Sequence, residues 1–189
     1  MNVEALWPWL CYGWLAGEGL IALTTHTRRS GGKVQDRGSL WILRAMITAA
    51  FLGEDWIGQI APARIFAGAE WLRPLSLAIL VAGLAVRATA IVTLGKAFSV
   101  NVAIRDSQKV QRKGLYRLVR HPSYLGMELI FLAVGLRSRN WACLAWIFIL
   151  PSLAVLYRIY VEEAALRKAF GEEYAAYSRE TKRLIPGVF

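Results

Sequence analysis

The chain has 189 residues, of which 56% are apolar and 19% are charged, and its formal net charge is +10. A soluble domain of this length needs more charged surface than this composition supplies. A basic balance often indicates nucleic-acid binding, but the apolar fraction argues against that class here. Lysine and arginine in membrane proteins collect in cytoplasmic loops and face anionic headgroups, so we expect a membrane protein in contact with anionic lipids.

Runs of about 20 apolar residues indicate transmembrane helices. Five segments approach this criterion: Leu6–Leu23, Leu40–Ile60, Pro74–Leu94, Pro122–Leu136 and Trp141–Tyr157. The second is expected to stop near Gly53, because acidic residues follow. The last two are short and joined by four residues, which predicts a tight helical hairpin. The first lacks a basic lead and a small-residue cleavage pattern, so it is predicted to be an anchor rather than a removable signal.

Two connecting segments are rich in basic residues and poor in acidic ones. Thr24–Ser39 contains Arg28, Arg29, Lys33 and Arg37 against a lone Asp36, and Gly95–His121 contains seven basic residues against Asp106. The positive-inside rule places both segments in the cytoplasm. With five spans, the N-terminus is then extracytoplasmic and the C-terminus cytoplasmic. This orientation leaves Arg137 and Arg139 outside, and it predicts that Glu54–Trp71, with its aromatic residues Trp56, Phe66 and Trp71, lies along the outer interface.

The remainder of the chain, residues 161–189, is charged. Within it, Ala165, Leu166, Ala169 and Phe170 are spaced for an amphipathic helix, which Gly171 should end. The fold class predicted is therefore an all-α integral membrane protein with about five transmembrane helices and a cytoplasmic C-terminal amphipathic helix. Cys11 and Cys143 fall inside apolar segments and indicate neither a disulfide nor a metal site.

Four ionisable residues lie at a similar depth, within a predicted span or directly after it. Under this topology Glu18, Arg87 and Arg158 occupy the cytoplasmic halves of their spans, and Glu128 lies about two turns from the same side. A charge at membrane depth is costly and usually faces a bundle interior or a wet cavity. Snorkelling to the surface is the alternative for each arginine. Four such residues at similar depth predict a shared polar pocket that opens toward the cytoplasm beside His121.

Arg158 and Glu162 are four residues apart and therefore share one helix face, whereas Glu163 points about 100° away. The simple interpretation is a surface ion pair. In the functional interpretation, the guanidinium holds a carboxylate while the neighbouring carboxylate holds an ammonium group. An amino acid or a derivative of one would carry both groups.

Two blocks of residues match a known pattern. They are Gly114-x-Tyr116-x-x-x-Arg120-His121-Pro122-x-Tyr124-x-Gly126 and Glu162-Glu163-x-x-Leu166-x-x-x-Phe170-Gly171-x-x-Tyr174-x-x-Tyr177, followed by Pro186. Their spacing, with the apolar hairpin between them, resembles the isoprenylcysteine carboxyl methyltransferase family, in its short bacterial or archaeal form. The resemblance covers roughly Gly95 to Phe189, and the three preceding spans carry no matching motif.

The resemblance implies a multi-pass membrane enzyme that uses S-adenosylmethionine without a Rossmann domain, and no glycine-rich loop of Rossmann type occurs here. We therefore expect two regions in one integrated domain. Residues 1–94 form the three transmembrane helices predicted from hydropathy, and residues 95–189 form a cofactor-binding region with a re-entrant cap, the helical hairpin and the C-terminal helix. Cofactor-binding roles are implied for Val110 near the adenine, for Glu162 at the charged end, and for Tyr116, His121, Pro122, Ser123, Tyr124 and Glu163. Arg158 and Glu162 would be the catalytic pair, with Arg158 binding the acceptor.

The acceptor stays open at this stage. An isoprenylcysteine-like carboxylate, supplied by a lipid or a prenylated protein from the bilayer, would need no base at neutral pH. A phospholipid amine would need a base, and Glu128 is the candidate. Glu128 is an acid where the family usually has apolar or aromatic residues, so it could also favour binding of a cationic acceptor. A small thiol is a further acceptor, and an NADPH-dependent reductase of sterol type and a non-catalytic membrane scaffold are alternative functions.

Overall fold

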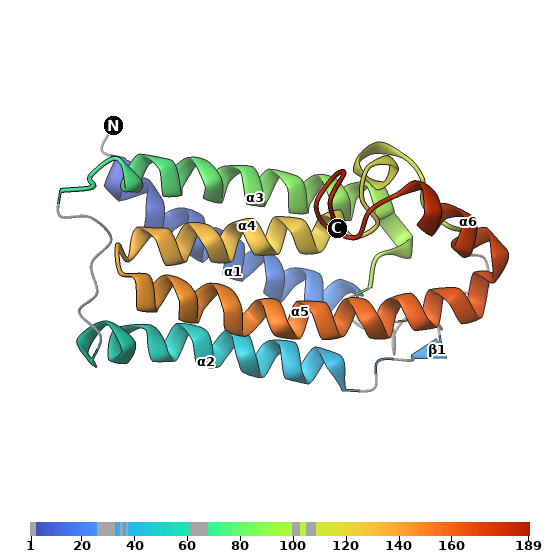
Figure 1. The fold of residues 1–189 in the computed structure, drawn as a ribbon, viewed down its shortest axis with the longest axis horizontal. Coiled ribbons are helices and arrows are strands. Elements are labelled where there is room, and N and C mark those ends of the chain that lie inside the picture. The colour runs from blue at the N-terminus through green and yellow to red at the C-terminus, as the bar shows by residue number, and fades with distance from the viewer. Residues whose placement is uncertain are drawn as a thin grey trace.

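The computed structural model describes residues 3–25, 33–34, 36, 38–60, 68–99, 103–104 and 109–189. Within these residues the helices are α1 (Val3–Thr25), α2 (Ser39–Ile60), α3 (Leu72–Leu94), α4 (Pro122–Arg137), α5 (Trp141–Phe170) and α6 (Glu172–Glu180). Helices α1 to α5 run along the long axis of the molecule, and α5 projects past the others toward α6 (Figure 1). The prediction of an all-α protein is confirmed.

The two basic connecting segments meet at one end of the bundle. Strand β1 (Lys33–Val34) pairs antiparallel with β2 (Ala103–Ile104), with Lys33 opposite Ile104. Short 3₁₀ turns, η2 (Gly95–Ala97) and η3 (Gly114–Arg117), lie in the second segment. The predicted loop residues Arg28, Arg29, Arg37, Phe66, Arg105 and Asp106 lie outside the described residues.

Two of the described helices, Leu72–Leu94 and Trp141–Phe170, are long and apolar enough to cross a membrane by length and composition. Helix α2 does not stop near Gly53, because its backbone bonding continues through the acidic residues to Ile60. The segment that begins at Glu54 is therefore at first helical, and Trp56 and Trp71 are both exposed. Five spans and the position of the termini remain predictions.

The helical hairpin predicted from the short polar link is confirmed. Pro122 occupies the first turn of α4, where its missing N–H costs nothing, and α4 ends at Arg137. Asn140 caps α5 by accepting hydrogen bonds from the backbone N–H groups of Ala142 and Cys143, at 2.8 and 3.2 Å. Because α4 ends at Arg137 and α5 begins at Trp141, the link between the two helices is only a few residues long.

The last predicted span and the amphipathic helix after it are not separate elements. Helix α5 continues without interruption from Trp141 to Phe170, because no glycine or proline interrupts it after Pro151. Gly171 then ends the helix as predicted, at φ = 50°, a conformation that favours glycine. A separate helix, α6, follows at once.

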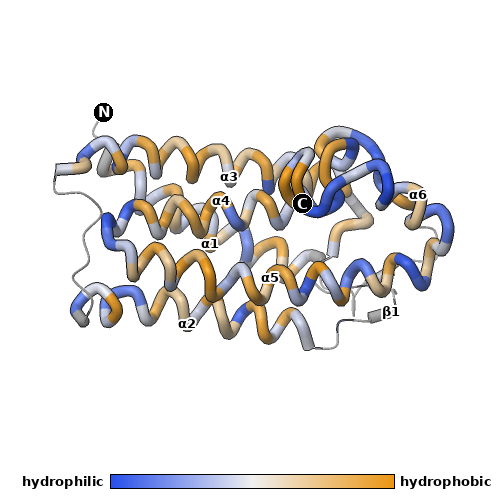
Figure 2. Tube along the Cα trace, in the orientation of Figure 1, coloured by the Kyte–Doolittle hydropathy of each residue, from blue (hydrophilic) through white to orange (hydrophobic). Residues whose placement is uncertain are grey.

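Helices α3 and α4 pack very closely through two glycines. A Cβ atom on Gly126 would lie 2.7 Å from the backbone nitrogen of Arg87, and one on Gly83 would lie 2.9 Å from the carbonyl oxygen of Gly126. Small residues permit this approach between membrane helices. Apolar residues dominate the bundle, whereas hydrophilic residues gather around α6 and the chain after it (Figure 2). The glycine of the Tyr124-x-Gly126 motif therefore brings Arg87 against the start of α4.

Candidate active site

A cavity of about 430 Å³ lies at the end of the bundle nearest α6. Its wall is formed by the second halves of α1 and α3, the starts of α2 and α4, the last turns of α5, and α6. Seven of the ten residues assigned to a site from sequence line it: Val110, Tyr116, His121, Ser123, Tyr124, Arg158 and Glu162. Both motif blocks therefore meet at one cavity, together with the first half of the chain.

Tyr124 links the two residues of the predicted catalytic pair. Arg158 Nε donates a hydrogen bond to the Tyr124 hydroxyl at 2.9 Å, and that hydroxyl donates to Glu162 Oε2 at 2.8 Å. The guanidinium of Arg158 is almost fully buried, with a side-chain exposure of 3%. The pair is thus part of a polar chain on the cavity wall, rather than a surface ion pair.

An ion pair between Glu18 and Arg87 joins α1 to α3 on the cavity wall. Arg87 donates from Nε and Nη2 to the two carboxylate oxygens of Glu18, with 2.6 Å between Nη2 and Oε2. Its Nη1 donates to the Ser123 hydroxyl at 2.8 Å. Bidentate pairing of this kind fixes the guanidinium plane. The predicted polar pocket therefore contains Glu18, Arg87 and Arg158 beside His121.

Three buried tyrosines support the wall on the side of α6. The Tyr177 hydroxyl donates to the backbone carbonyl of Tyr116 at 2.7 Å. Burial raises the pKa of Tyr177 to about 12, and it also raises the pKa of Tyr116 and Tyr174. All three phenols therefore stay neutral at physiological pH and do not act as bases.

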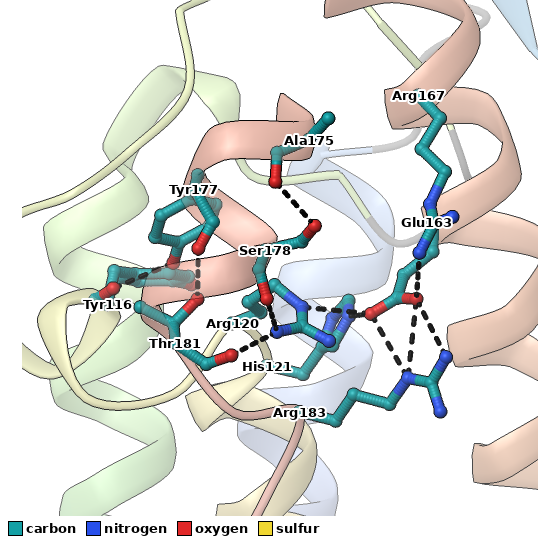
Figure 3. Close-up of polar contacts among 10 residues, drawn as sticks. All are labelled: Tyr116, Arg120, His121, Glu163, Arg167, Ala175, Tyr177, Ser178, Thr181 and Arg183. Atoms are coloured by element: carbon teal, nitrogen blue, oxygen red, sulfur yellow. Dashed lines mark hydrogen bonds and ion pairs between the residues drawn. The ribbon is translucent and has the colours of Figure 1, made fainter. Parts of the chain in front are cut away.

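Glu163 does not line the cavity. It is buried, and its carboxylate is surrounded by basic side chains (Figure 3). Its carboxylate lies 3.0 Å from Arg120 Nε, 3.2 Å from Arg183 Nη2 and 3.4 Å from His121 Nε2. The reason is helical geometry, since Glu163 points about 100° away from Glu162. Glu163 therefore holds the side chains of Arg120 and His121 in position.

The C-terminal chain also holds Arg120 and His121, through backbone hydrogen bonds. The N–H groups of Arg120 and His121 donate to the carbonyl oxygens of Lys182 and Arg183, at 2.7 and 3.0 Å. The Arg120 side chain also donates from Nη1 to the carbonyl oxygens of Ser178, at 3.1 Å, and Thr181. The segment with the motif histidine is therefore fixed from both sides.

Pro122 and Glu128 also lie away from the cavity wall. Pro122 is fully buried at the start of α4. Glu128 faces α5, where its Oε2 accepts a hydrogen bond from Ser152 Oγ at 2.5 Å. Two other residues of α4, Tyr124 and Met127, line the cavity. The Glu128 carboxylate does not line the cavity, although it is on the same helix.

Sequence reasoning missed Asp36 and Ser39, which contact Arg158. Arg158 Nη1 donates to Ser39 Oγ at 2.9 Å and to Asp36 Oδ1 at 3.2 Å. An acid four residues before an apolar run signals the start of a helix, but nothing in the sequence relates Asp36 to an arginine more than a hundred positions later.

The cavity combines an apolar wall with charged groups. Leu15 of α1 and Leu43 and Ile47 of α2 face it from one side, and the chain of Arg158, Tyr124 and Glu162 faces it from another. Cavities of roughly 300–1,000 Å³ with a few placed polar groups are typical of small-molecule sites. This arrangement suits a ligand with one charged and one apolar end.

Comparison with known proteins identifies related sequences. The model of the isoprenylcysteine carboxyl methyltransferase (ICMT) family matches residues 76–168. Protein-S-isoprenylcysteine O-methyltransferase B of Arabidopsis thaliana is 29% identical over 120 residues, which cover 59% of this chain and 58% of that protein. Protein-S-isoprenylcysteine O-methyltransferase of Tribolium castaneum is 29% identical over 114 residues, which cover 59% of this chain and 41% of that protein. The match therefore spans about six-tenths or less of each relative.

The fold is also similar to a solved structure, that of the eukaryotic intramembrane Ras methyltransferase ICMT. The TM-score is 0.63 with 24% sequence identity, and the match covers 77% of this chain and 52% of that one. The shared region of sequence contains the start of α4 and the Arg158–Glu162 pair, whereas α1 and α2 lie outside it.

Proposed function

We propose that the protein is a membrane methyltransferase that uses S-adenosylmethionine, because residues 76–168 match the model of the isoprenylcysteine carboxyl methyltransferase family. Its acceptor would be the carboxylate of an isoprenylcysteine-like or other lipidic molecule. The observation that carries this proposal is the chain of hydrogen bonds from Arg158 through Tyr124 to Glu162 on the wall of the cavity.

The residues of the cavity fit the cofactor. Glu162 presents a carboxylate that would hold its ammonium group, and Val110 offers an apolar surface for the adenine. Tyr116, His121, Ser123 and Tyr124 would surround it, as the motif implies. Pro122 and Glu163 would act indirectly, because the first begins α4 and the second holds Arg120 and His121 in place.

When bound, S-adenosylmethionine would supply a methyl group on a positively charged sulfur; its carbon would bond to an acceptor oxygen, and the electron pair of the broken carbon–sulfur bond would stay on sulfur, leaving S-adenosylhomocysteine. A carboxylate is already ionised at neutral pH, so this reaction needs no base. The protein must align the groups and exclude water. Arg158 would fix the acceptor carboxylate with its planar guanidinium, while the buried wall keeps the site dry.

The acceptor would come from the bilayer, since the apolar wall of the cavity is formed by α1 and α2, helices that expose large apolar side chains such as Leu15 and Trp41. The basic end of the bundle would face the cytoplasm and anionic headgroups, with the N-terminus outside and the C-terminus inside. Both halves of the chain line the cavity, which supports a single integrated domain.

The position of Glu128 bears on the amine alternative. An amine acceptor needs a base, and the carboxylate assigned to that task is bonded to Ser152 instead of facing the cavity. The carboxylate acceptor therefore remains the better supported of the two. A thiol acceptor would use the same cavity without requiring Arg158.

The test of this function is a ligand titration on purified protein in detergent. S-adenosylhomocysteine, the product of the cofactor, should bind with a single site, and NADPH should not bind. If NADPH binds and S-adenosylhomocysteine does not, the result supports the reductase alternative. If neither binds, the result supports a non-catalytic scaffold.

A further inference from the structure

Arg158 is held at two separate points of its guanidinium group. On one side Nε donates to the Tyr124 hydroxyl at 2.9 Å. On the other side Nη1 donates to Ser39 Oγ at 2.9 Å and to Asp36 Oδ1 at 3.2 Å. Contacts at both Nε and Nη1 restrict rotation of the planar group about its long side chain, which otherwise has many rotamers.

Asp36 is itself held in place by the start of α2. Its Oδ1 accepts a hydrogen bond from the backbone N–H of Leu40 at 3.1 Å and another from the hydroxyl of Ser39. Its carbonyl oxygen accepts from the N–H of Ser39 at 2.9 Å. The carboxylate that meets Arg158 is therefore positioned by a helix terminus, and is not a mobile surface group.

The Asp36 charge and its partner Arg158 lie in a partly buried environment. Arg158 has a side-chain exposure of 3% and Asp36 of 12%, so the pair is largely shielded from water. A buried guanidinium without a carboxylate nearby is costly, and it would move toward any other acceptor within reach. Without the Asp36 charge, Arg158 would therefore lose its fixed orientation on the cavity wall.

We propose that Asp36 is a positioning residue for methyl transfer, acting through Arg158. With Ser39 it holds the guanidinium in the plane needed to orient the acceptor. The inference rests on the proposed function. It extends that function to the first half of the chain, because Asp36 lies outside residues 76–168.

The helix-start role of Asp36 can be separated from its charge. Asparagine serves as well as aspartate at a helix start, so Asp36→Asn keeps the bond from Leu40 and removes only the charge. Asp36→Ala removes both. Asp55→Asn, at an exposed position near the other end of α2, is the control for loss of one acidic charge from this region.

The experiment measures methyl transfer to N-acetyl-S-farnesylcysteine, a prenylated cysteine with a free carboxylate, in detergent-purified protein. Asp36→Asn should lower kcat about tenfold, with little change in the KM of the acceptor, while the affinity for S-adenosylhomocysteine stays near wild type. In an Arg158→Lys background the same substitution should have almost no further effect, because residues that act through one another are not additive. Asp55→Asn should behave as wild type.

Three results would overturn the inference: an unchanged kcat for Asp36→Asn, a lower acceptor KM without loss of kcat, or an effect of full size in the Arg158→Lys background. The second would mean that Asp36 competes with the acceptor. If wild type binds S-adenosylhomocysteine but does not methylate the probe, the proposed acceptor is wrong. In that case the inference is tested by the thermal unfolding temperatures of Asp36→Asn, Arg158→Lys and the double variant. If the effects of the two substitutions simply add, Asp36 does not act through Arg158 and the inference is overturned.

Discussion

The hydroxyl of Tyr124 on α4 lies 2.8 Å from the carboxylate of Glu162 on α5, and it accepts a hydrogen bond from Arg158 one turn earlier on that helix. One phenol therefore connects the residue proposed to hold the acceptor with the residue proposed to hold the cofactor. It also ties the two motif blocks to each other across the helical hairpin.

Removal of this hydroxyl should slow the reaction without unfolding the protein. Tyr124→Phe keeps the ring and loses two hydrogen bonds to charged groups. Such a bond contributes about 1.5–3 kcal/mol, and if the transition state loses the equivalent of one of them, methyl transfer should fall roughly tenfold to a hundredfold. Tyr160→Phe, at an exposed position on α5, is the control and should keep full activity. Single-turnover rates for both variants check this, and equal rates would remove Tyr124 from the site.

The roles of Arg158 and Glu162 can be separated by two substitutions. Arg158→Lys keeps the charge but loses the planar guanidinium, so transfer should fall strongly while S-adenosylhomocysteine still binds. Glu162→Gln should weaken binding of S-adenosylhomocysteine itself by roughly tenfold to a hundredfold, because a charge-assisted bond contributes about 1.5–3 kcal/mol. Titration calorimetry measures both affinities. If Arg158→Lys loses as much affinity as Glu162→Gln, this division of roles is wrong.

The ion pair between Glu18 and Arg87 should stabilise the fold. Glu18→Gln leaves Arg87, whose side chain is 9% exposed, without its charged partner. Breaking a buried pair costs about 3–5 kcal/mol, and because Glu18 is partly exposed we expect about 1–3 kcal/mol. At about 2–4 °C per kcal/mol, thermal unfolding in detergent should shift down by several degrees.

Glu70 provides the matched control for that measurement. It pairs with Arg139 and Arg73 at the opposite end of the bundle, and its side chain is 62% exposed. Surface pairs contribute about 0–1 kcal/mol, so Glu70→Gln should leave the melting temperature nearly unchanged. A similar loss in both variants would indicate that the Glu18 pair is no more than a surface contact.

Glu163 should act on the cavity through the chain segment that precedes α4. Glu163→Gln removes the charge that holds Arg120, His121 and Arg183. The backbone amides of Arg120 and His121, which donate to Lys182 and Arg183, should then exchange faster with deuterium, and cofactor affinity should fall with them. Loss of affinity with unchanged exchange at these amides would instead point to direct contact between Glu163 and the cofactor.

The orientation in the membrane can be tested with single cysteines on a background from which Cys11 and Cys143 have been removed. Glu172→Cys, at an exposed position at the start of α6, should be shielded from an impermeant thiol reagent in intact cells. Glu70→Cys, at the opposite end of the bundle, should react with the reagent. The basic end of the bundle would then face the cytoplasm, as the positive-inside rule predicts. The reverse labelling pattern would invert the topology.

Local patterns predicted much of the fold. The polar link between two apolar runs gave the helical hairpin, Gly171 marked the end of α5, and charges at similar depth in separate spans located Glu18, Arg87 and Arg158 at one pocket. Each of these follows from hydrophobic periodicity, backbone conformation or the cost of a charge in lipid. The length of α5 was underestimated because a change in polarity at Tyr157 does not end a helix.

The partners of individual side chains could not be predicted in the same way. Glu162 and Glu163 are adjacent, yet one lines the cavity and the other is buried among Arg120, His121 and Arg183, since the turn of the helix separates them. The contact between Asp36 and Arg158 depends on how α2 packs on α5. Such contacts between distant segments arise only from the packed fold.

Transfer of a labelled methyl group from S-adenosylmethionine to N-acetyl-S-farnesylcysteine, in a single turnover by the purified protein, tests the proposed reaction most directly. The product should be a methyl ester, recognised because mild base releases the label as methanol. Wild type should form it, and Arg158→Lys should form it far more slowly with cofactor binding retained. Label that resists base, or no label transferred while S-adenosylhomocysteine binds, would contradict carboxylate methylation.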